Sequence, residues 1–155
     1  MANDGGLMAK LEQWMVDTIA ALGLFKTADL WKHQVGLDGG GTESFTQYEP
    51  FAFVSYAAAD TAREGGNDLR QVLEFAVVIG VESKVAGIAR FGDANNRGVN
   101  SLRDSLIAAF DRARPDDETV TCDEFYYTGD FLVVDTPKRC ALEMRFECSQ
   151  MTDVN

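Results

Sequence analysis

The sequence predicts an α+β domain in which an antiparallel β-sheet carries two main amphipathic helices packed on one face. Two segments, 7–22 and 99–110, repeat apolar residues at steps of three and four, the spacing of an amphipathic helix. Two others, 69–82 and 139–149, alternate along the chain as strands with one buried face do. The predicted order is helix, two strands, helix and three strands, which favours helices packed on an antiparallel sheet.

The first predicted helix covers residues 7–22. Its apolar stripe consists of Leu7, Leu11, Trp14 or Met15, Ile19 and Leu22. Asp4 is a candidate N-cap, and Gly23 suits a left-handed residue after the last turn. The following residues, 26–48, contain a glycine run and are predicted to be irregular, with or without one short strand.

Two strands, 51–58 and 69–82, are predicted to form an arm joined by a polar, glycine-containing turn. In the second strand one face is apolar throughout: Leu73, Phe75, Val77, Ile79 and Val81. The opposite face is half apolar and carries Glu74, Ala76, Val78 and Gly80. This pattern predicts a sheet that is partly covered on its second side.

The second helix is predicted to bury Val99, Leu102, Leu106, Ile107 and Phe110. Asp93, Asn95 or Asn96 is expected to cap it, and Pro115 to end it. Three strands, 119–127, 130–135 and 139–149, are expected to follow, with turns at Gly129-Asp130 and at 136–138.

The last strand has the clearest alternation in the chain. Its core face is predicted to consist of Cys140, Leu142, Met144, Phe146 and Cys148. Its other face, toward solvent or a partner, carries Arg139, Glu143, Arg145 and Glu147. A face of alternating sign suits a repeated contact between copies of one chain.

Length and composition indicate one domain spanning residues 1–155, with 46% hydrophobic and 25% charged residues. The formal charge of −11 disfavours sequence-independent binding to nucleic acid or anionic lipid. No apolar run approaches the ~18 residues of a membrane span, and the first residues do not resemble a signal peptide. We therefore expect a soluble chain that resides in a cytoplasm.

The sequence contains no recognisable catalytic, metal or cofactor motif. Cys122, Cys140 and Cys148 have no CxxC spacing and are expected to be reduced thiols, while the single histidine, His33, has no partner at ligand spacing. The glycine run at 39–41 fits neither the P-loop nor the dinucleotide fingerprint, and residues 93–98 lack the calcium-loop spacing. We expect no enzyme, no metal and no cofactor.

Aromatic residues gather near the predicted turn at Gly129: Phe125, Tyr126, Tyr127 and Phe131. The local charge is acidic, which disfavours stacking with nucleic-acid bases. A core or a subunit contact explains these residues better.

As a pattern of elements, the chain resembles the tail terminator and neck proteins of tailed bacteriophages, and most of all the Mu-like prophage type. The resemblance is carried by the opening helix LMAKLEQWMVDTIAAL, by EPFAFVSYAA with the turn AREGGND into LRQVLEFAVVIGVES, by NNRGVNSLRDSLIAAF, and by the outgoing strand RCALEMRFECSQ. It covers about residues 7–149, and residues 26–48 match least.

This resemblance implies a structural virion protein. Tail terminators form a ring, typically a hexamer, that caps the tail tube, ends its polymerisation and provides the surface for attachment of the head through its connector. The expected partners are therefore the chain itself, the tail tube protein and the head connector or neck proteins. DNA passes through the bore without specific binding, and an acidic lumen would repel its phosphates. The implied location is the tail or neck of the virion, after assembly in the host cytoplasm.

Under this hypothesis the arm contacts a neighbouring subunit or the tube. The candidate interface residues are Arg63, Glu64, Gly65, Gly66, Asn67, Asp68, Arg70, Glu74, Arg139, Glu143, Arg145 and Glu147. The glycines would let the backbone adapt to a ring contact, and the charged residues are candidates for inter-subunit ion pairs. An ordinary exposed hairpin would have the same sequence features.

Three alternatives remain open at this level. A head-completion or head-to-tail joining protein would share the ring and leave tail length unchanged. A small-molecule-binding or enzymatic α+β domain would use the aromatic residues near Tyr126 and Tyr127 and would have a concave pocket. A regulatory interaction domain would form only a dimer.

Overall fold

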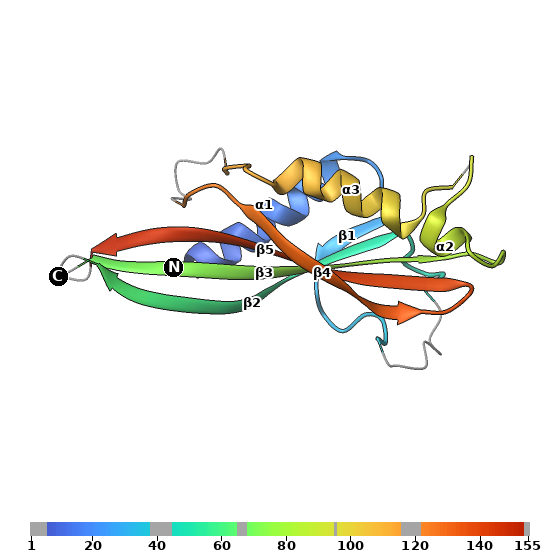
Figure 1. Ribbon diagram of the computed structural model, residues 1–155, viewed down its shortest axis with the longest axis horizontal. Helices are drawn as coiled ribbons and strands as arrows, with labels where there is room; N and C mark the ends of the chain where they lie inside the picture. Colours follow the sequence, from blue (N-terminus) through green and yellow to red (C-terminus); the bar gives the residue numbers. More distant parts are fainter. Residues whose placement is uncertain (1–5, 38–44, 65–67, 95, 116–121, 154–155) are drawn as a thin grey trace, which may run out of the picture.

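The computed structural model describes residues 6–37, 45–64, 68–94, 96–115 and 122–153. The fold is α+β, with a five-stranded mixed sheet and three helices (Figure 1). In chain order the elements are α1 (Gly6–Ala21), β1 (Thr27–Leu30), β2 (Phe51–Glu64), β3 (Asp68–Glu82), α2 (Ile88–Phe91), α3 (Val99–Phe110), β4 (Tyr126–Asp135) and β5 (Arg139–Asp153).

The sheet has the strand order β1-β2-β3-β5-β4 and one parallel pair. β1 runs parallel to β2, with Thr27 opposite Phe51, and the other three pairs are antiparallel. The prediction of a wholly antiparallel sheet is therefore wrong at this edge. β1 and β2 run in the same direction, and a parallel pair requires a crossover connection between its strands.

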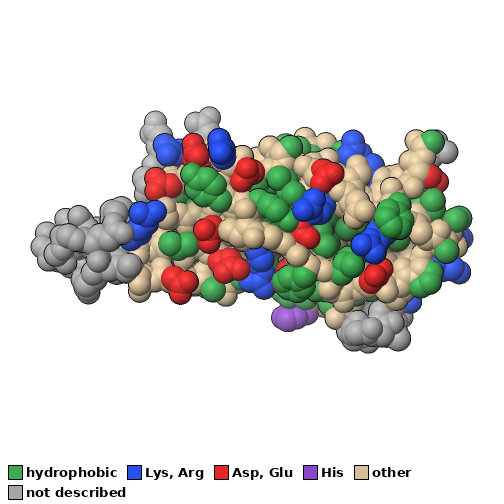
Figure 2. Space-filling model, viewed as in Figure 1, with side chains coloured by type: hydrophobic (Ala, Val, Ile, Leu, Met, Phe, Trp, Pro, Cys, Tyr) green, Lys and Arg blue, Asp and Glu red, His purple; other side chains and the backbone are tan. Residues whose placement is uncertain are grey.

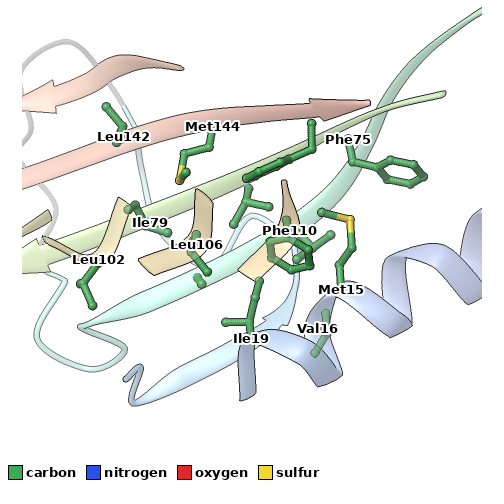
Figure 3. Close-up of a cluster of buried hydrophobic side chains, with 14 of the residues drawn as sticks. Met15, Val16, Ile19, Phe75, Ile79, Leu102, Leu106, Phe110, Leu142 and Met144 are labelled. Carbon is green, nitrogen blue, oxygen red and sulfur yellow. The ribbon is translucent and has the colours of Figure 1, made fainter. Parts of the chain in front are cut away.

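The larger core cluster contains residues of all three helices together with one face of strands β3 and β5 (Figure 3). α1 contributes Leu11, Met15, Val16 and Ile19, and α3 contributes Val99, Leu102, Leu106 and Phe110. The strand residues in this cluster include the predicted apolar faces of β3 and β5, which confirms both assignments. Helix α1 ends next to Gly23, whose φ of 67° is the predicted left-handed conformation.

A second, smaller core cluster lies on the opposite face and is rich in aromatic rings. Its buried members are Val35, Phe45, Phe51, Phe53, Val78, Val134 and Ala141, with Trp31, Leu37, Tyr48 and Val133 packed against them. Residues of the 31–50 connection thus cover part of this face, as the half-apolar face of β3 predicts.

The second main helix begins differently from the prediction. Its N-cap is Gly98, which has no side chain to donate or accept a capping bond. Asp93 instead closes its own turn: its carboxylate accepts a hydrogen bond from the Asn96 amide at 2.8 Å. Gly98 is needed here because a Cβ would lie 2.4 Å from the Gly92 nitrogen. The alternative caps, Asn95 here and Asp4 in the first helix, lie outside the described residues.

The end of α3 also differs from the prediction. The helix stops at Phe110, where Asp111 is the C-cap and Arg112 has a φ of 64°, so Pro115 does not mark its boundary. The four-residue α2 has no counterpart among the predicted elements.

β4 replaces two of the predicted strands. The predicted turn at Gly129-Asp130 is wrong, because Tyr126–Asp135 is one strand paired with β5. Its register shifts between Tyr127 and Gly129, and the φ of 149° at Gly129 accommodates the irregularity. Residues 122–125, predicted as strand, precede it without strand structure.

Candidate functional site

β2, β3 and β5 continue beyond the core as a three-stranded extension, which we call the arm (Figure 1). It consists of residues 57–64, 68–72 and 149–153. Both strands flanking β3 are longer than predicted: β2 runs to Glu64 and β5 to Asp153. The pairing is continuous, from Ala58 opposite Glu74 to Glu64 opposite Asp68, and on the other side as far as Asp153.

The outer edges of the arm have no neighbouring strand within the part of the chain that the structure describes. β1 pairs with β2 only as far as Val54, and β4 pairs with β5 only as far as Glu147. Just beyond these points, the Tyr56 amide donates to the Glu12 carboxylate at 3.0 Å. The Asp123 amide donates to the Ser149 carbonyl at 2.8 Å. Along the rest of each edge, no strand of the described ranges pairs with the backbone donors and acceptors.

The structure describes only some of the residues predicted for the tip of the arm. Arg63 and Glu64 lie in β2, and Asp68 lies opposite Glu64 at the start of β3. Gly65, Gly66 and Asn67 lie outside the described residues. Arg70 is exposed in β3, between Ala62 of β2 and Met151 of β5.

The charged residues predicted on β3 and β5 are brought together within one chain. The Arg145 guanidinium bonds Glu74 through Nη1 at 3.0 Å and Glu143 through Nε at 2.7 Å and through Nη2. Burial alone would lower the pKa of Arg145, but its hydrogen bonds to Glu143 and Glu74 outweigh burial and raise it.

The remaining two candidates on this face lie at its ends. Arg139 is opposite Glu82 in the strand register, and its Nε lies 3.5 Å from a Glu82 carboxylate oxygen. Glu147 is opposite Glu74 in β3 and Tyr126 in β4. The mixed-charge face is thus already organised by in-chain contacts, and a role between subunits stays a prediction.

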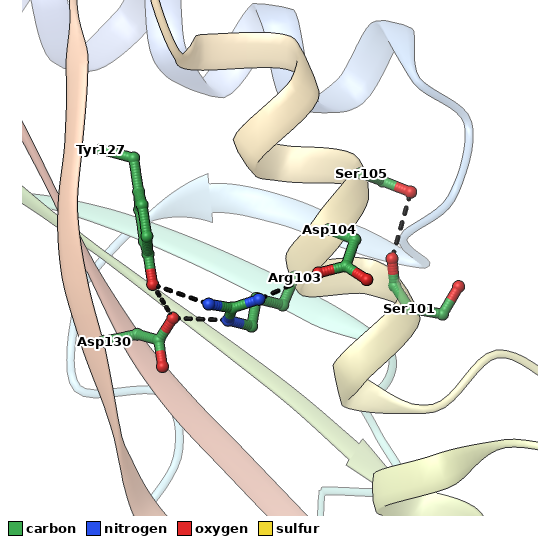
Figure 4. A network of polar contacts seen from close by, with 6 residues as sticks. All are labelled: Ser101, Arg103, Asp104, Ser105, Tyr127 and Asp130. Atoms are coloured by element: carbon green, nitrogen blue, oxygen red, sulfur yellow. Dashed lines mark hydrogen bonds and ion pairs between the residues drawn. The ribbon is translucent and has the colours of Figure 1, made fainter.

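A partly buried polar network that the sequence does not indicate joins α3 to β4 (Figure 4). Arg103 donates through Nε to Asp130 at 2.5 Å and through Nη2 to the Tyr127 hydroxyl at 3.0 Å, and Tyr127 donates to Asp130. Burial and the hydrogen bond to Asp130 raise the pKa of Tyr127, so its hydroxyl stays a donor. Only the tertiary structure reveals this network, because Arg103 lies on α3 whereas Tyr127 and Asp130 lie on β4.

The network borders an open groove of about 560 Å³, whose lining also includes Arg90 and Leu132. The side chains of Arg103, Tyr127 and Asp130 are each directed at another member of the network, and their hydrogen bonds connect α3 to β4. Figure 2 shows hydrophobic, acidic and basic side chains interspersed over the same side of the molecule as seen in Figure 1.

The described ranges contain no set of side chains arranged as metal ligands. Among these residues, no three His, Cys, Asp or Glu side chains are placed to hold a metal ion. His33 is exposed, with its ring 5.3 Å from that of Trp31. No helix in the described ranges has the length and apolar character needed to cross a membrane.

No protein-family model matches the chain, and no curated protein matches its sequence. The functional argument therefore rests on the fold and its surfaces.

Proposed function

We propose that this protein is a phage tail terminator, which assembles as a ring on the end of the tail tube. The observation that carries the proposal is the arm, a three-stranded extension whose outer edges are unpaired in the described chain. In this proposal α1 and α3 form one helix layer on one face of the sheet, and the arm extends from that body toward a neighbour. Their shared core cluster supports this layer.

An unpaired edge of this length can form backbone hydrogen bonds with a strand of another chain. Natural proteins protect edge strands with proline, charge or a covering element, because an open edge templates aggregation. Phe51–Glu64 contains no proline, and its exposed stretch begins at Tyr56 and continues through three alanines, Ala57, Ala58 and Ala59. Such small side chains allow a second chain to approach closely, so we infer that another copy covers this edge.

The two ends of the arm's sheet expose different strands, β2 on one side and β5 on the other. A contact that joins the β2 edge of one copy to a different surface of the next is heterologous, and a heterologous contact forms a ring when its rotation closes and an open filament when it does not. In this proposal the contact closes into a ring, and the resemblance implies six subunits.

Charge is compatible with passage of DNA through such a ring. The chain carries a formal charge of −11, and a lumen lined by repeated acidic subunits repels phosphates. The in-chain pairs of Arg145 hold the mixed-charge face in one conformation. Because each exposed ion pair stabilises a contact only weakly, about 0–1 kcal/mol, the apolar and backbone contacts of the arm must supply most of the affinity.

Placing a lysine on the arm edge is expected to prevent ring formation without unfolding the chain. Lysine is the residue by which natural edge strands avoid pairing. We expect the wild-type chain to form a sixfold assembly, alone or on purified tail tubes, and Ala58→Lys to remain monomeric at the same concentration. Native mass spectrometry and negative-stain electron microscopy measure both.

The matched control is Ala108→Lys, the same substitution at an exposed position of α3. It should leave the ring intact, and both variants should melt within about 3 °C of wild type, since exposed substitutions change stability little. A ring that forms equally well with Ala58→Lys would contradict the role of the arm. A wild-type chain that stays monomeric or dimeric even with tail tubes would contradict the ring itself.

A further inference from the structure

Two of the three cysteines meet at the base of the arm. Cys122 lies in the segment before β4 and packs against the core cluster that contains Cys148 of β5. Their chain neighbours are tied together twice: the Asp123 amide donates to the Ser149 carbonyl at 2.8 Å, and the Ser149 hydroxyl donates to the Asp123 carboxylate at 2.9 Å. These bonds hold the chain at Cys122 beside the part of β5 that carries Cys148.

The two thiols differ in access and in acidity. Cys122 is half-buried, whereas Cys148 is 1% exposed. A hydrogen bond from the Cys148 thiol to the Cys122 sulfur lowers the pKa of Cys122 and, together with burial, raises that of Cys148. A partly accessible thiol of lowered pKa beside a second thiol is the arrangement found where cysteines react with oxidants.

We propose that Cys122 and Cys148 form a thiol-modification site that reacts with small-molecule disulfides to give an intramolecular disulfide. The Cys122 thiolate attacks one sulfur of the oxidant, whose S–S bond breaks and releases one thiolate with the bonding electron pair. Cys148 then attacks the Cys122 sulfur of the mixed disulfide and expels the second thiolate, which takes up the Cys148 proton as it leaves. Two protein thiols are oxidised, and one disulfide is reduced to two thiols.

Cys140 provides an internal comparison. It lies on the same face of β5, is fully buried, and has its pKa raised to about 11 by burial and by Asp135. Its surroundings hold the thiol protonated and inaccessible, so it should react at least ~100-fold more slowly than Cys122.

The proposed bond joins the arm to the body of the protein. Cys148 is the last core residue of β5 before residues 149–153 enter the arm. A disulfide to Cys122 therefore fixes the start of this strand to the segment that leads into β4. Closing this loop is expected to raise the melting temperature by about 5–10 °C.

The test uses the full chain, oxidised glutathione as the probe, and alkylation of the remaining thiols after denaturation. Mass spectrometry of the wild type should show three free thiols falling to one, with a peptide pair linked through Cys122 and Cys148. Cys140→Ser should fall from two to none at the same rate. Dithiothreitol should restore all thiols and reverse the rise in melting temperature.

Two further variants show which cysteine acts in which step of the reaction. Cys148→Ser should retain glutathione on Cys122, and Cys122→Ser should gain no intramolecular disulfide and no rise in melting temperature. The proposal is overturned if the wild type keeps three thiols under conditions that oxidise free dithiols. It is also overturned if the disulfide involves Cys140 or links two chains. The result is independent of ring formation, since it is read on the single chain.

Discussion

Phe146→Ala is expected to lower the free energy of unfolding by about 3–5 kcal/mol, because it opens a cavity in the larger core cluster. Phe146 of β5 is fully buried. Its ring centroid lies 5.2 Å from that of Phe110 in α3 and 5.7 Å from that of Tyr127 in β4. The substitution therefore weakens the packing of a helix and a strand on the sheet at once. Equilibrium unfolding in urea, followed by circular dichroism, measures the loss.

The matched control is Phe131→Ala, since Phe131 lies in the neighbouring strand and is 50% exposed. Its loss should cost about 1 kcal/mol or less. Equal losses for the two variants would mean that Phe146 is not a core residue, and the packing of α3 on β5 would have to be revised.

Gly80→Ala is expected to destabilise the protein by about 1–3 kcal/mol through overpacking. The added Cβ would lie 2.2 Å from the Cζ of Phe51, the residue opposite it in β2. The Phe51 ring has little freedom to move, because it is stacked on Phe53 at 4.8 Å and meets Phe45 edge-on at 5.2 Å. In a strand without this clash, alanine would be more stable than glycine, by about 0.5–1 kcal/mol. The sign of the change is therefore diagnostic.

A double-mutant cycle separates the clash from other effects. In a Phe51→Leu background the shorter side chain leaves room for the methyl group, so Gly80→Ala should cost at least about 1 kcal/mol less than in wild type. Thermal and chemical unfolding of the four proteins measure the coupling. A stabilising effect in both backgrounds would contradict the position of the Phe51 ring.

The inner strands β3 and β5 could be predicted because the alternation of apolar and polar residues along them follows the alternation of buried and exposed positions. In β3 and β5 every second residue is apolar, and a shift of one residue would turn all of them to the other face. The two-residue period of apolar residues in the sequence therefore agrees with the observed burial, and the faces of both strands are predicted correctly. The first helix is equally regular, and its bounds differ from the prediction by one residue at each end.

β1 could not be assigned with its direction, for a different physical reason. It is four residues long, so it contains too few alternations to define a face. Its parallel pairing depends on how the 31–50 connection packs its aromatic residues across the second face, which is a tertiary effect. The prediction of a turn at Gly129 failed for a related reason. Glycine suits a turn and a β-irregularity equally, and only the pairing with β5 distinguishes them.

The candidate site, too, could be predicted from the sequence only in part. The sequence indicates that β5 presents alternating charges, but the register decides which of them meet. Arg145 is directly opposite Ala76, and it reaches Glu74 diagonally across the pair. The contact of Cys122 with Cys148 depends on how the segment before β4 returns to β5, and no spacing rule gives it.

Tail length tests the central proposal most directly. Electron microscopy of lysates from a phage that lacks the gene for this chain should show overlong tails of variable length without heads, because nothing ends polymerisation of the tube. Supplying the wild-type chain should restore a uniform length, and supplying Ala58→Lys should not. Tails of normal length in the absence of the chain would contradict its role as a terminator; if such tails were detached from filled heads, the ring would instead belong to a joining protein.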